Sequence, residues 1–448
     1  MTNKLFGTDG IRGKAGVFPM DVDFLVVLAK VLSKIGVKEN KKIAIGKDTR
    51  ISADMIESAL SAGFLQSGVD VISLGVIPTP CMTSMIENLN VDMGIMITAS
   101  HNPYFDNGIK LINNKGDKFS DEFYALIEKE LDNHEANTVS GNIGKIIKNE
   151  SIVEQYIEKI RNIAPNYKAL QGLRVVLDCA NGAYHYILPQ IFKDLGAGVI
   201  AINNTPNGYN INEKCGSQHT DELSKVVIET KANFGIAVDG DGDRIILVDD
   251  KGRNIDGDQL LCFLANYMKK HDMLDNNAVI STEWSNLGLG EYLSQNNFTY
   301  FKSKVGERYV IDLMKEKKAK LGGELVGHIV LSKYGKTGDA AVVGVIISLG
   351  FLELNKKLSD VFPIFNPYPC IIENIRFSSR EYMLESVEHE DVKEAIDKAK
   401  QRLGASSNLI VRKSGTEPVI KLRVEDKDEL IVREIAENLK AIISKYQK

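Results

Sequence analysis

The chain has little cysteine, and its cysteines lie far apart. Five occur in 448 residues, and no Cys-x-x-Cys pair is present. Disulfide-rich and zinc-ribbon domains need closely spaced cysteines, so the sequence argues against both classes. The scatter instead predicts reduced, buried thiols in a cytoplasmic protein. The cysteines are Cys81, Cys179, Cys215, Cys262 and Cys370.

Long apolar runs are also missing. The N-terminus, MTNKLFGTDGIRG, has no apolar core of the kind a signal peptide needs, so we expect no signal peptide. The longest apolar stretch, from Ala340 to Leu352, is too short to span a bilayer and predicts a buried helix. We therefore expect no membrane partner.

A strong charge of either sign is absent, and so are the common nucleotide motifs. The net charge is −5, which provides no overall field for nucleic acid, so any bound phosphate must be held by a local site. The sequence contains no G-x-x-x-x-G-K-[ST], G-x-G-x-x-G, G-x-S-x-G or H-E-x-x-H. This weighs against a P-loop kinase, a dinucleotide enzyme, a serine hydrolase and a zinc protease.

What the chain does contain is a repeated alternation of β-rich runs and helical patterns. The runs KKIAIG, VDVISLG and MGIMITAS form a first group, and further groups lie within Leu173–Asp243 and Asn277–Leu331. Such alternation implies parallel sheets with right-handed crossovers, which bind ligands beyond the carboxyl ends of their strands. The C-terminal segment has the pattern of a strand, a loop, a second strand and a helix, which predicts a small α+β domain. Polar or proline-rich stretches place domains at residues 1–148, 149–252, 253–364 and 365–448.

One segment spaces three carboxylates by single glycines: Asp239-Gly240-Asp241-Gly242-Asp243. Glycine lets the backbone turn tightly, so the carboxylates can converge on one cation. All-oxygen ligands suit magnesium where phosphate also binds. An acidic surface turn is the plain alternative, but apolar runs flank the segment. An EF-hand calcium loop, with Asp250 in twelfth position, would need glycine where Arg244 stands and a helix where FGIAV stands.

A second segment, Thr98-Ala99-Ser100-His101-Asn102-Pro103, follows the apolar run MGIMI. Ser100 is therefore expected on the turn that leaves a strand. A serine there can carry a phosphoryl group if a base and cations are near, and His101 and Lys110 could supply proton transfer and charge. A polar turn without chemistry is the alternative, and the serine gains weight only from the other segments.

Two further segments suit binding of a phosphorylated sugar. In Arg412-Lys413-Ser414-Gly415-Thr416, two cations, two hydroxyls and a glycine-freed amide can form an anion cradle, although an ordinary turn explains the segment equally well. In GGELVGH, Glu324 could accept hydrogen bonds from sugar hydroxyls, although a lone Glu and His in such a loop are commonly structural.

The order of these segments resembles the α-D-phosphohexomutase superfamily. FGTDGIRG, TASHNP, DGDGDR, GGE-x-x-GH and R-x-SGTEP follow one another over the whole chain as they do in that family. ASHNPYFDNGIK, INEKCGSQH, SNLGL and the TGD at 337–339 are similar to the branch that acts on an amino-sugar phosphate. The resemblance implies an α/β fold, with three similar mixed-sheet α/β domains plus a small C-terminal α+β domain around a central cleft.

The resemblance also implies a reaction and its residues. The enzyme would interconvert glucosamine 6-phosphate and glucosamine 1-phosphate through a phosphoserine and a 1,6-bisphosphate, feeding amino-sugar nucleotides for the bacterial envelope. Mg²⁺ would be the cofactor, and hexosamine or hexose 1,6-bisphosphate would be the activator. The protein would be a cytoplasmic monomer or homodimer, with a phosphosugar substrate as its only predicted partner. The resemblance makes Ser100 the phosphate carrier, and it assigns the metal to Ser100, Asp239, Asp241 and Asp243. Catalytic roles are implied for His101, Lys110, Arg12 and Arg244. Glu324 and His328 would bind the sugar, and the untransferred phosphate would be bound by Arg412, Ser414, Gly415 and Thr416.

Two alternatives remain open at this point: a mutase for glucose or mannose phosphates, and a phosphosugar-binding protein without catalysis. The sequence also departs from the family pattern. Val326 replaces the serine of the sugar loop, which removes a hydroxyl contact worth roughly 0.5 to 1.5 kcal/mol. Trp284, Glu307 and Lys421 stand where a smaller residue, aspartate and arginine are expected.

Overall fold

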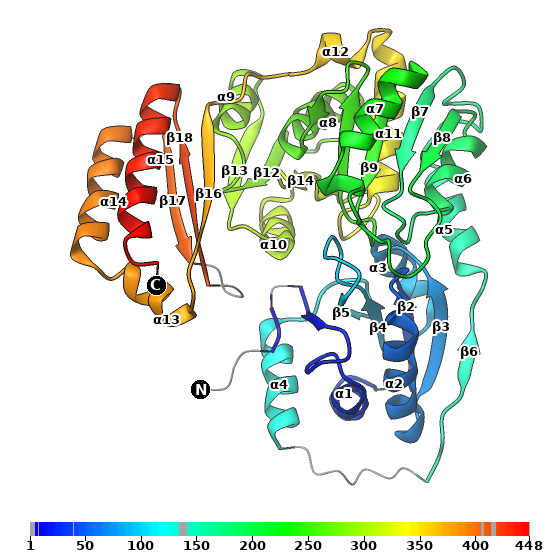
Figure 1. Cartoon of the computed structure of the whole chain (residues 1–448). Helices are drawn as coiled ribbons and strands as arrows, with labels where there is room; N and C mark the ends of the chain where they lie inside the picture. Colours follow the sequence, from blue (N-terminus) through cyan, green and yellow to red (C-terminus); the bar gives the residue numbers. More distant parts are fainter. Residues whose placement is uncertain are drawn as a thin grey trace. The chain divides into compact units, whose positions relative to one another are not determined.

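The computed structural model describes residues 5–7, 9–38, 40–133, 141–404, 407–413 and 418–447. By their packing these residues fall into two compact units. The first runs to Trp284 and includes Phe298–Ile364, and the second combines Ser285–Asn297 with the chain from Phe365 onward. The first unit contains three sheets and the second contains one, each with helices beside it (Figure 1).

The first sheet has the order β1-β5-β4-β2-β3-β6. Strands β4, β2, β3 and β6 run parallel, while β5 runs antiparallel to both of its neighbours, β4 and β1. Helices α1, α2 and α4 share one apolar core with this sheet, and Gly94 of β4 lets Met82 and Ile86 pack closely on the opposite face. The elements are β1 (Ile11–Lys14), α1 (Val22–Ile35), β2 (Lys42–Lys47), α2 (Ala53–Gln66), β3 (Asp70–Val76), α3 (Thr79–Met85), β4 (Met93–Ile97), β5 (Asp106–Asn113), α4 (Asp121–Asp132) and β6 (Ile146–Lys148).

The second sheet has the order β11-β10-β9-β7-β8. Strands β9, β7 and β8 are parallel, and β10 returns antiparallel to β9. All residues of β9 and β10 are buried, which explains their continuous apolar runs. The elements are α5 (Ile152–Arg161), β7 (Arg174–Asp178), α6 (Ile187–Asp194), β8 (Gly198–Ile202), α7 (Asp221–Thr230), β9 (Phe234–Val238), β10 (Ile245–Asp249) and β11 (Asn254–Ile255).

The third sheet has the order β13-β12-β14-β15, with β15 antiparallel to β14. The run LGGELVGHIVL, at the end of the third β-rich group, therefore forms two strands joined by residues 324–328. The elements are α8 (Gly257–Lys270), β12 (Ala278–Thr282), β13 (Thr299–Ser303), α10 (Glu307–Lys317), β14 (Leu321–Gly323), β15 (Ile329–Leu331), α11 (Ala340–Leu354) and α12 (Leu358–Val361).

Helix α11 confirms the buried helix predicted from the apolar run at Ala340. It is apolar on all sides because it packs against elements of both the second and the third sheet. Side chains of β9, β10 and α6 surround Gly344, and the Phe351 and Phe234 rings lie 5.3 Å apart. Asp339 caps the helix by accepting the amides of Ala341 and Val342.

The second unit contains an antiparallel sheet with the order β16-β18-β17. Helices α14 and α15 pack on it through a shared apolar core. Helix α9 belongs to the same unit, and the Leu287 amide donates to Glu425 at 2.7 Å. The elements are α9 (Leu287–Gln295), β16 (Cys370–Arg376), α13 (Arg380–Ser386), α14 (Glu390–Leu403), β17 (Asn408–Lys413), β18 (Val419–Glu425) and α15 (Glu429–Ser444).

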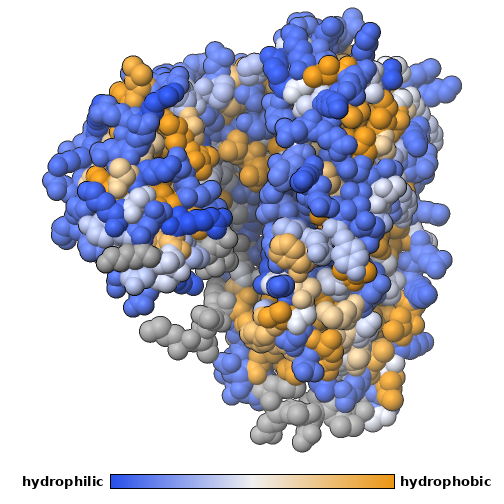
Figure 2. Space-filling view, viewed as in Figure 1, coloured by the Kyte–Doolittle hydropathy of each residue, from blue (hydrophilic) through white to orange (hydrophobic). Residues whose placement is uncertain are grey.

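The predicted succession of three mixed α/β sheets and a final α+β sheet is confirmed. All five cysteines are free; four are buried, and Cys370 is half-buried. Within the described ranges, no helix combines the length and apolarity that crossing a bilayer requires. Polar residues cover much of the face seen in Figure 2, with apolar residues in separate patches.

Candidate active site

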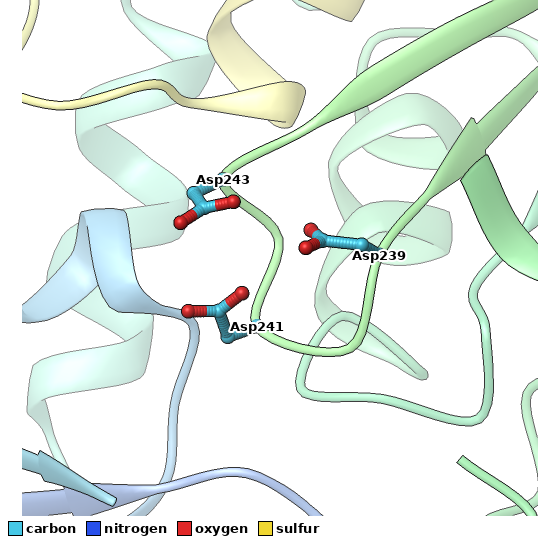
Figure 3. A group of neighbouring side chains, drawn as sticks. All are labelled: Asp239, Asp241 and Asp243. Carbon is cyan, nitrogen blue, oxygen red and sulfur yellow. The ribbon is translucent and has the colours of Figure 1, made fainter. Parts of the chain in front are cut away.

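Three buried carboxylates lie in the turn between β9 and β10. Asp239, Asp241 and Asp243 surround a common space (Figure 3), and one oxygen from each lies within 4.8 Å of the others. The turn is tight because Gly242 has a φ of +77°. Strands flank the turn on both sides, so the helix that an EF-hand requires is absent there.

The charges of this turn fit a bound cation. Burial and repulsion from Asp243 and Asp241 raise the pKa of Asp239 well above its usual value. In the part of the chain that the structure describes, one buried oxygen of Asp241 and one of Asp243 have no hydrogen-bond partner. Three oxygen donors with spare lone pairs, close together and out of water, suit a hard divalent cation such as Mg²⁺.

Lys110, from β5, reaches the same turn. Its Nζ lies 2.7 Å from Asp241 and 2.9 Å from Asp243. Burial opposes the charge of Lys110, but the two carboxylates outweigh it and raise the pKa well above its usual value. Lys110 is therefore a fixed cation at the centre of the site. Thr79, which the sequence analysis did not single out, donates to Asp241 at 2.6 Å.

Ser100 follows β4 directly, as predicted, and faces the aspartates. Its Oγ donates to Asp239 at 2.6 Å and lies 3.3 Å from Nδ1 of His101. The residue is buried and has a φ of +53°, a left-handed conformation that is rare for a residue with a side chain. The structure thus brings together Ser100, His101, Lys110 and the three aspartates.

The pKa of His101 is lowered to about 3. Burial is the main cause, and the positive charges of Arg244 and Arg12 add to it. The imidazole is therefore neutral near pH 7. Arg12 and Arg244, both predicted as site residues, thus help to lower the pKa of the imidazole next to Ser100.

Arg12 and Arg244 lie on different elements. Arg12, in β1, donates to Asp9 at 3.1 Å and to the carbonyl of Ala99 at 3.4 Å. Arg244 follows the aspartate turn, and its Nε lies 3.9 Å from Asp243. That buried Nε has no hydrogen-bond partner among the described residues, so Arg244 retains a donor for a ligand.

The predicted sugar loop contributes Glu324 and His328. One carboxylate oxygen of Glu324 accepts the Gly306 amide at 3.0 Å. The His328 imidazole lies between two carboxylates, with Nε2 at 2.9 Å from Glu307 and Nδ1 at 3.6 Å from Asp243. His328 therefore connects the loop of the third sheet to the aspartate turn of the second.

Three charged residues join this network without having been predicted as site residues. Asp9 pairs with Lys110 at 3.2 Å and with Lys118 at 2.5 Å, and Lys118 also pairs with Glu307. The only sequence signal for Asp9 is its place in FGTDGIRG, and Glu307 stands out only as a departure from the family pattern. Lys118 gives no signal, because its partners lie 109 and 189 residues away.

The predicted phosphate cradle is placed only in part. Arg412 lies exposed near the end of β17. Ser414, Gly415 and Thr416 lie outside the described residues.

Four family models match the chain in sequence order and together cover most of it. They are described as phosphoglucomutase/phosphomannomutase alpha/beta/alpha domain I at residues 3–138, domain II at 154–252, domain III at 256–368, and the C-terminal domain at 374–442.

Curated relatives match the full length. The phosphoglucosamine mutase of Brucella ovis is 42% identical over 448 residues, covering 99% of this chain and 98% of the relative. That of Bartonella quintana is 42% identical over 450 residues, covering 99% and 96%.

Solved structures share the fold. A phosphoglucomutase/phosphomannomutase family protein of Burkholderia thailandensis gives a TM-score of 0.80 at 21% identity, covering 100% of this chain and 98% of that one. The N-acetylphosphoglucosamine mutase of Aspergillus fumigatus, in complex with GlcNAc-6P and magnesium, gives 0.69 at 16% identity, covering 99% and 96%.

Proposed function

The chain belongs to the phosphoglucomutase/phosphomannomutase family, and on that premise we propose that it interconverts glucosamine 6-phosphate and glucosamine 1-phosphate. It is a phosphohexomutase, an isomerase that moves a phosphoryl group within one hexose phosphate. The choice of glucosamine rests on full-length relatives that are phosphoglucosamine mutases. The observation that carries the chemistry is the Ser100 hydroxyl, 2.6 Å from Asp239 in a turn with three buried carboxylates.

We propose that Mg²⁺ is held by Asp239, Asp241 and Asp243, together with an oxygen on Ser100. When bound, the cation would offset charge on the phosphoryl group, which is the main demand of this chemistry. The carboxylate oxygens without partners support this assignment. A solved family member of the same fold binds magnesium together with a phosphosugar.

In the proposed reaction, a sugar hydroxyl oxygen loses its proton and bonds to the phosphorus on Ser100, while the bond from Oγ to phosphorus breaks and Oγ gains a proton. This gives a hexosamine 1,6-bisphosphate. After the bisphosphate turns around, Oγ loses its proton and takes the other phosphoryl group, while the bond from that phosphorus to the sugar oxygen breaks and the sugar oxygen gains a proton. Lys110 and Arg244 neutralise negative charge on the group in transit. His101, with its Nδ1 at 3.3 Å, is placed to exchange a proton with Oγ.

The remaining assignments complete the proposal. Glu324 and His328 bind sugar hydroxyls, and Arg412, Ser414, Gly415 and Thr416 bind the phosphate that is not being transferred. A hexosamine or hexose 1,6-bisphosphate phosphorylates Ser100 and so activates the enzyme. We propose a cytoplasmic location and a monomer or homodimer.

A comparison of substrates tests the proposed specificity. With magnesium and a trace of hexose 1,6-bisphosphate, we expect kcat/KM to be highest for glucosamine 6-phosphate among the 6-phosphates of glucosamine, glucose and mannose. A higher value for glucose or mannose 6-phosphate would assign the enzyme to a neutral hexose instead. No turnover of any of the three would favour a binding protein without catalysis.

Val326→Ser is expected to lower KM for glucosamine 6-phosphate by a factor of roughly two to ten, which corresponds to about 0.5 to 1.5 kcal/mol for one restored hydrogen bond. Val326 is 48% exposed, so a smaller polar side chain leaves no cavity. A sugar contact made in both the ground state and the transition state changes KM more than kcat. Steady-state kinetics checks this, and an unchanged or higher KM would show that position 326 does not set affinity. Val326→Ala is the control, because it removes the same methyl groups without adding a hydroxyl.

A further inference from the structure

We propose that Arg50 and Asn212 are positioning residues that hold Ser100 in its phosphate-carrying conformation; this inference rests on the proposed function. Each acts on the far side of Ser100, through its backbone carbonyl.

Arg50 is a buried arginine, 2% exposed, just beyond the end of β2. Its Nη2 donates to the carbonyls of Ser100 at 2.8 Å and Asn102 at 2.9 Å. Its Nη1 donates to the carbonyls of Asp106, at 2.9 Å, and Pro103. One rigid guanidinium fork therefore holds four carbonyls of the turn from Ser100 to Asp106.

The charge of Arg50 is balanced next to the turn that it holds. Its Nε donates to Asp48 at 2.9 Å, and Asp48 also accepts the Thr98 hydroxyl at 2.7 Å. The Thr98 hydroxyl oxygen in turn accepts the backbone amide of Ser100 at 2.9 Å. Both the amide and the carbonyl of Ser100 are thus tied, directly or through one side chain, to the pair formed by Arg50 and Asp48.

Asn212 approaches the same turn from the loop that follows β8. Its Nδ2 donates to the carbonyls of Ser100 at 2.8 Å and Asn102 at 3.1 Å, which are two of the four that Arg50 holds. Gly240 of the aspartate turn also lies against the Ser100 carbonyl, since a Cβ at Gly240 would stand 2.7 Å from that oxygen. Asn212 therefore couples the position of Ser100 to the segment that carries the aspartates.

These bonds explain how a left-handed serine is maintained in a buried turn. A φ of +53° at a residue with a side chain is strained, and it persists only where the surrounding structure enforces it. Arg50 and Asn212 donate to the Ser100 carbonyl in its present direction. They therefore disfavour a backbone conformation in which that carbonyl points elsewhere. Phosphoryl transfer depends on alignment of the reacting oxygen, and a shift of about 1 Å can cost about 100-fold in rate.

The test measures phosphorylation of Ser100 directly. Enzyme stripped of phosphate is mixed with hexose 1,6-bisphosphate and quenched, and the Ser100 peptide is quantified by mass spectrometry. We expect Arg50→Lys to slow phosphorylation and kcat by about 100-fold and Asn212→Gly by about tenfold, with KM changed less than about threefold. Glycine is chosen at position 212 because the φ there is +57°, so the backbone conformation is kept while both bonds are lost.

Arg253→Lys is the matched control. Arg253 also joins a carboxylate, Asp249 at 2.7 Å, to a carbonyl, Ser359 at 2.9 Å, but it lies in the turn between β10 and β11. We expect this variant to phosphorylate Ser100 at the unaltered rate. All assays are run well below the melting temperature of each variant, so that lost stability alone does not slow the reaction.

The outcomes separate this inference from the proposed function. If the unaltered enzyme never carries phosphate on Ser100, the proposed function fails. If it does, and Asn212→Gly and a folded Arg50→Lys react within about twofold of it, the positioning role is wrong. Should Arg50→Lys fail to fold, Asn212→Gly decides alone, because Asn212 is only half-buried.

Discussion

Ser100→Ala is expected to lower turnover of glucosamine 6-phosphate by about 10⁴-fold or more, because the side chain that accepts the phosphoryl group is removed. The hydroxyl is buried and lies 2.6 Å from Asp239, within the proposed metal site. We also expect purified unaltered protein to carry phosphate on Ser100, at least in part. Intact-mass and peptide mass spectrometry, together with kinetics, measure both effects.

The control for this variant is Ser58→Ala, which removes an exposed hydroxyl that donates to the Asp54 carbonyl within α2. It should leave both turnover and phosphate content unchanged. Phosphate found only at another residue, together with full activity of Ser100→Ala, would refute the assignment of Ser100 as carrier.

Asp241→Asn should lower kcat by about 100-fold or more while the protein stays folded. The change removes one of three charges proposed to hold the cation and one of the three carboxylates that pair with Lys110. Stability should change little, because asparagine has the same shape, can still accept from Thr79, and relieves repulsion among the aspartates. Circular dichroism and thermal melting check the fold, and kinetics at rising magnesium concentration checks the site.

Asp250→Asn provides a matched control for Asp241→Asn. Asp250 lies just beyond the other end of β10, and its carboxylate bonds Ser359 at 2.9 and 3.1 Å. We expect its turnover and magnesium dependence to stay unaltered. Unaltered enzyme should lose activity on chelation and regain it with added magnesium. Activity that is indifferent to chelation would contradict the metal assignment.

Much of this site follows from local sequence. A buried apolar run fixes where β4 ends, and therefore that Ser100 begins a turn at the carboxyl edge of its sheet. The glycines between the aspartates allow the turn between β9 and β10 to fold tightly. The same reasoning identifies β9 and α11, whose continuous apolar character admits few other structures. Such features depend on neighbouring residues alone, which explains why they can be predicted.

Other parts depend on packing between distant segments. Arg50 could not be identified from the sequence, because its role depends on carbonyls about 50 residues further along the chain that converge only in the folded turn. The link between Lys118 and Glu307 joins segments 189 residues apart. The antiparallel strands β1, β5 and β10 were not predicted either, since alternation of strands and helices indicates only the parallel core.

Helix α11 has a consequence for how the protein is made. It lies within the residues matched as domain III, yet it covers the second sheet, where Phe351 meets Phe234 and Gly344 faces β9 and β10. During translation the apolar face of the second sheet therefore stays exposed until the chain beyond Phe351 has left the ribosome. A fragment that stops at residue 252, where the match to domain II ends, would keep that face uncovered and is expected to aggregate. We therefore expect the second and third α/β segments to fold as one unit.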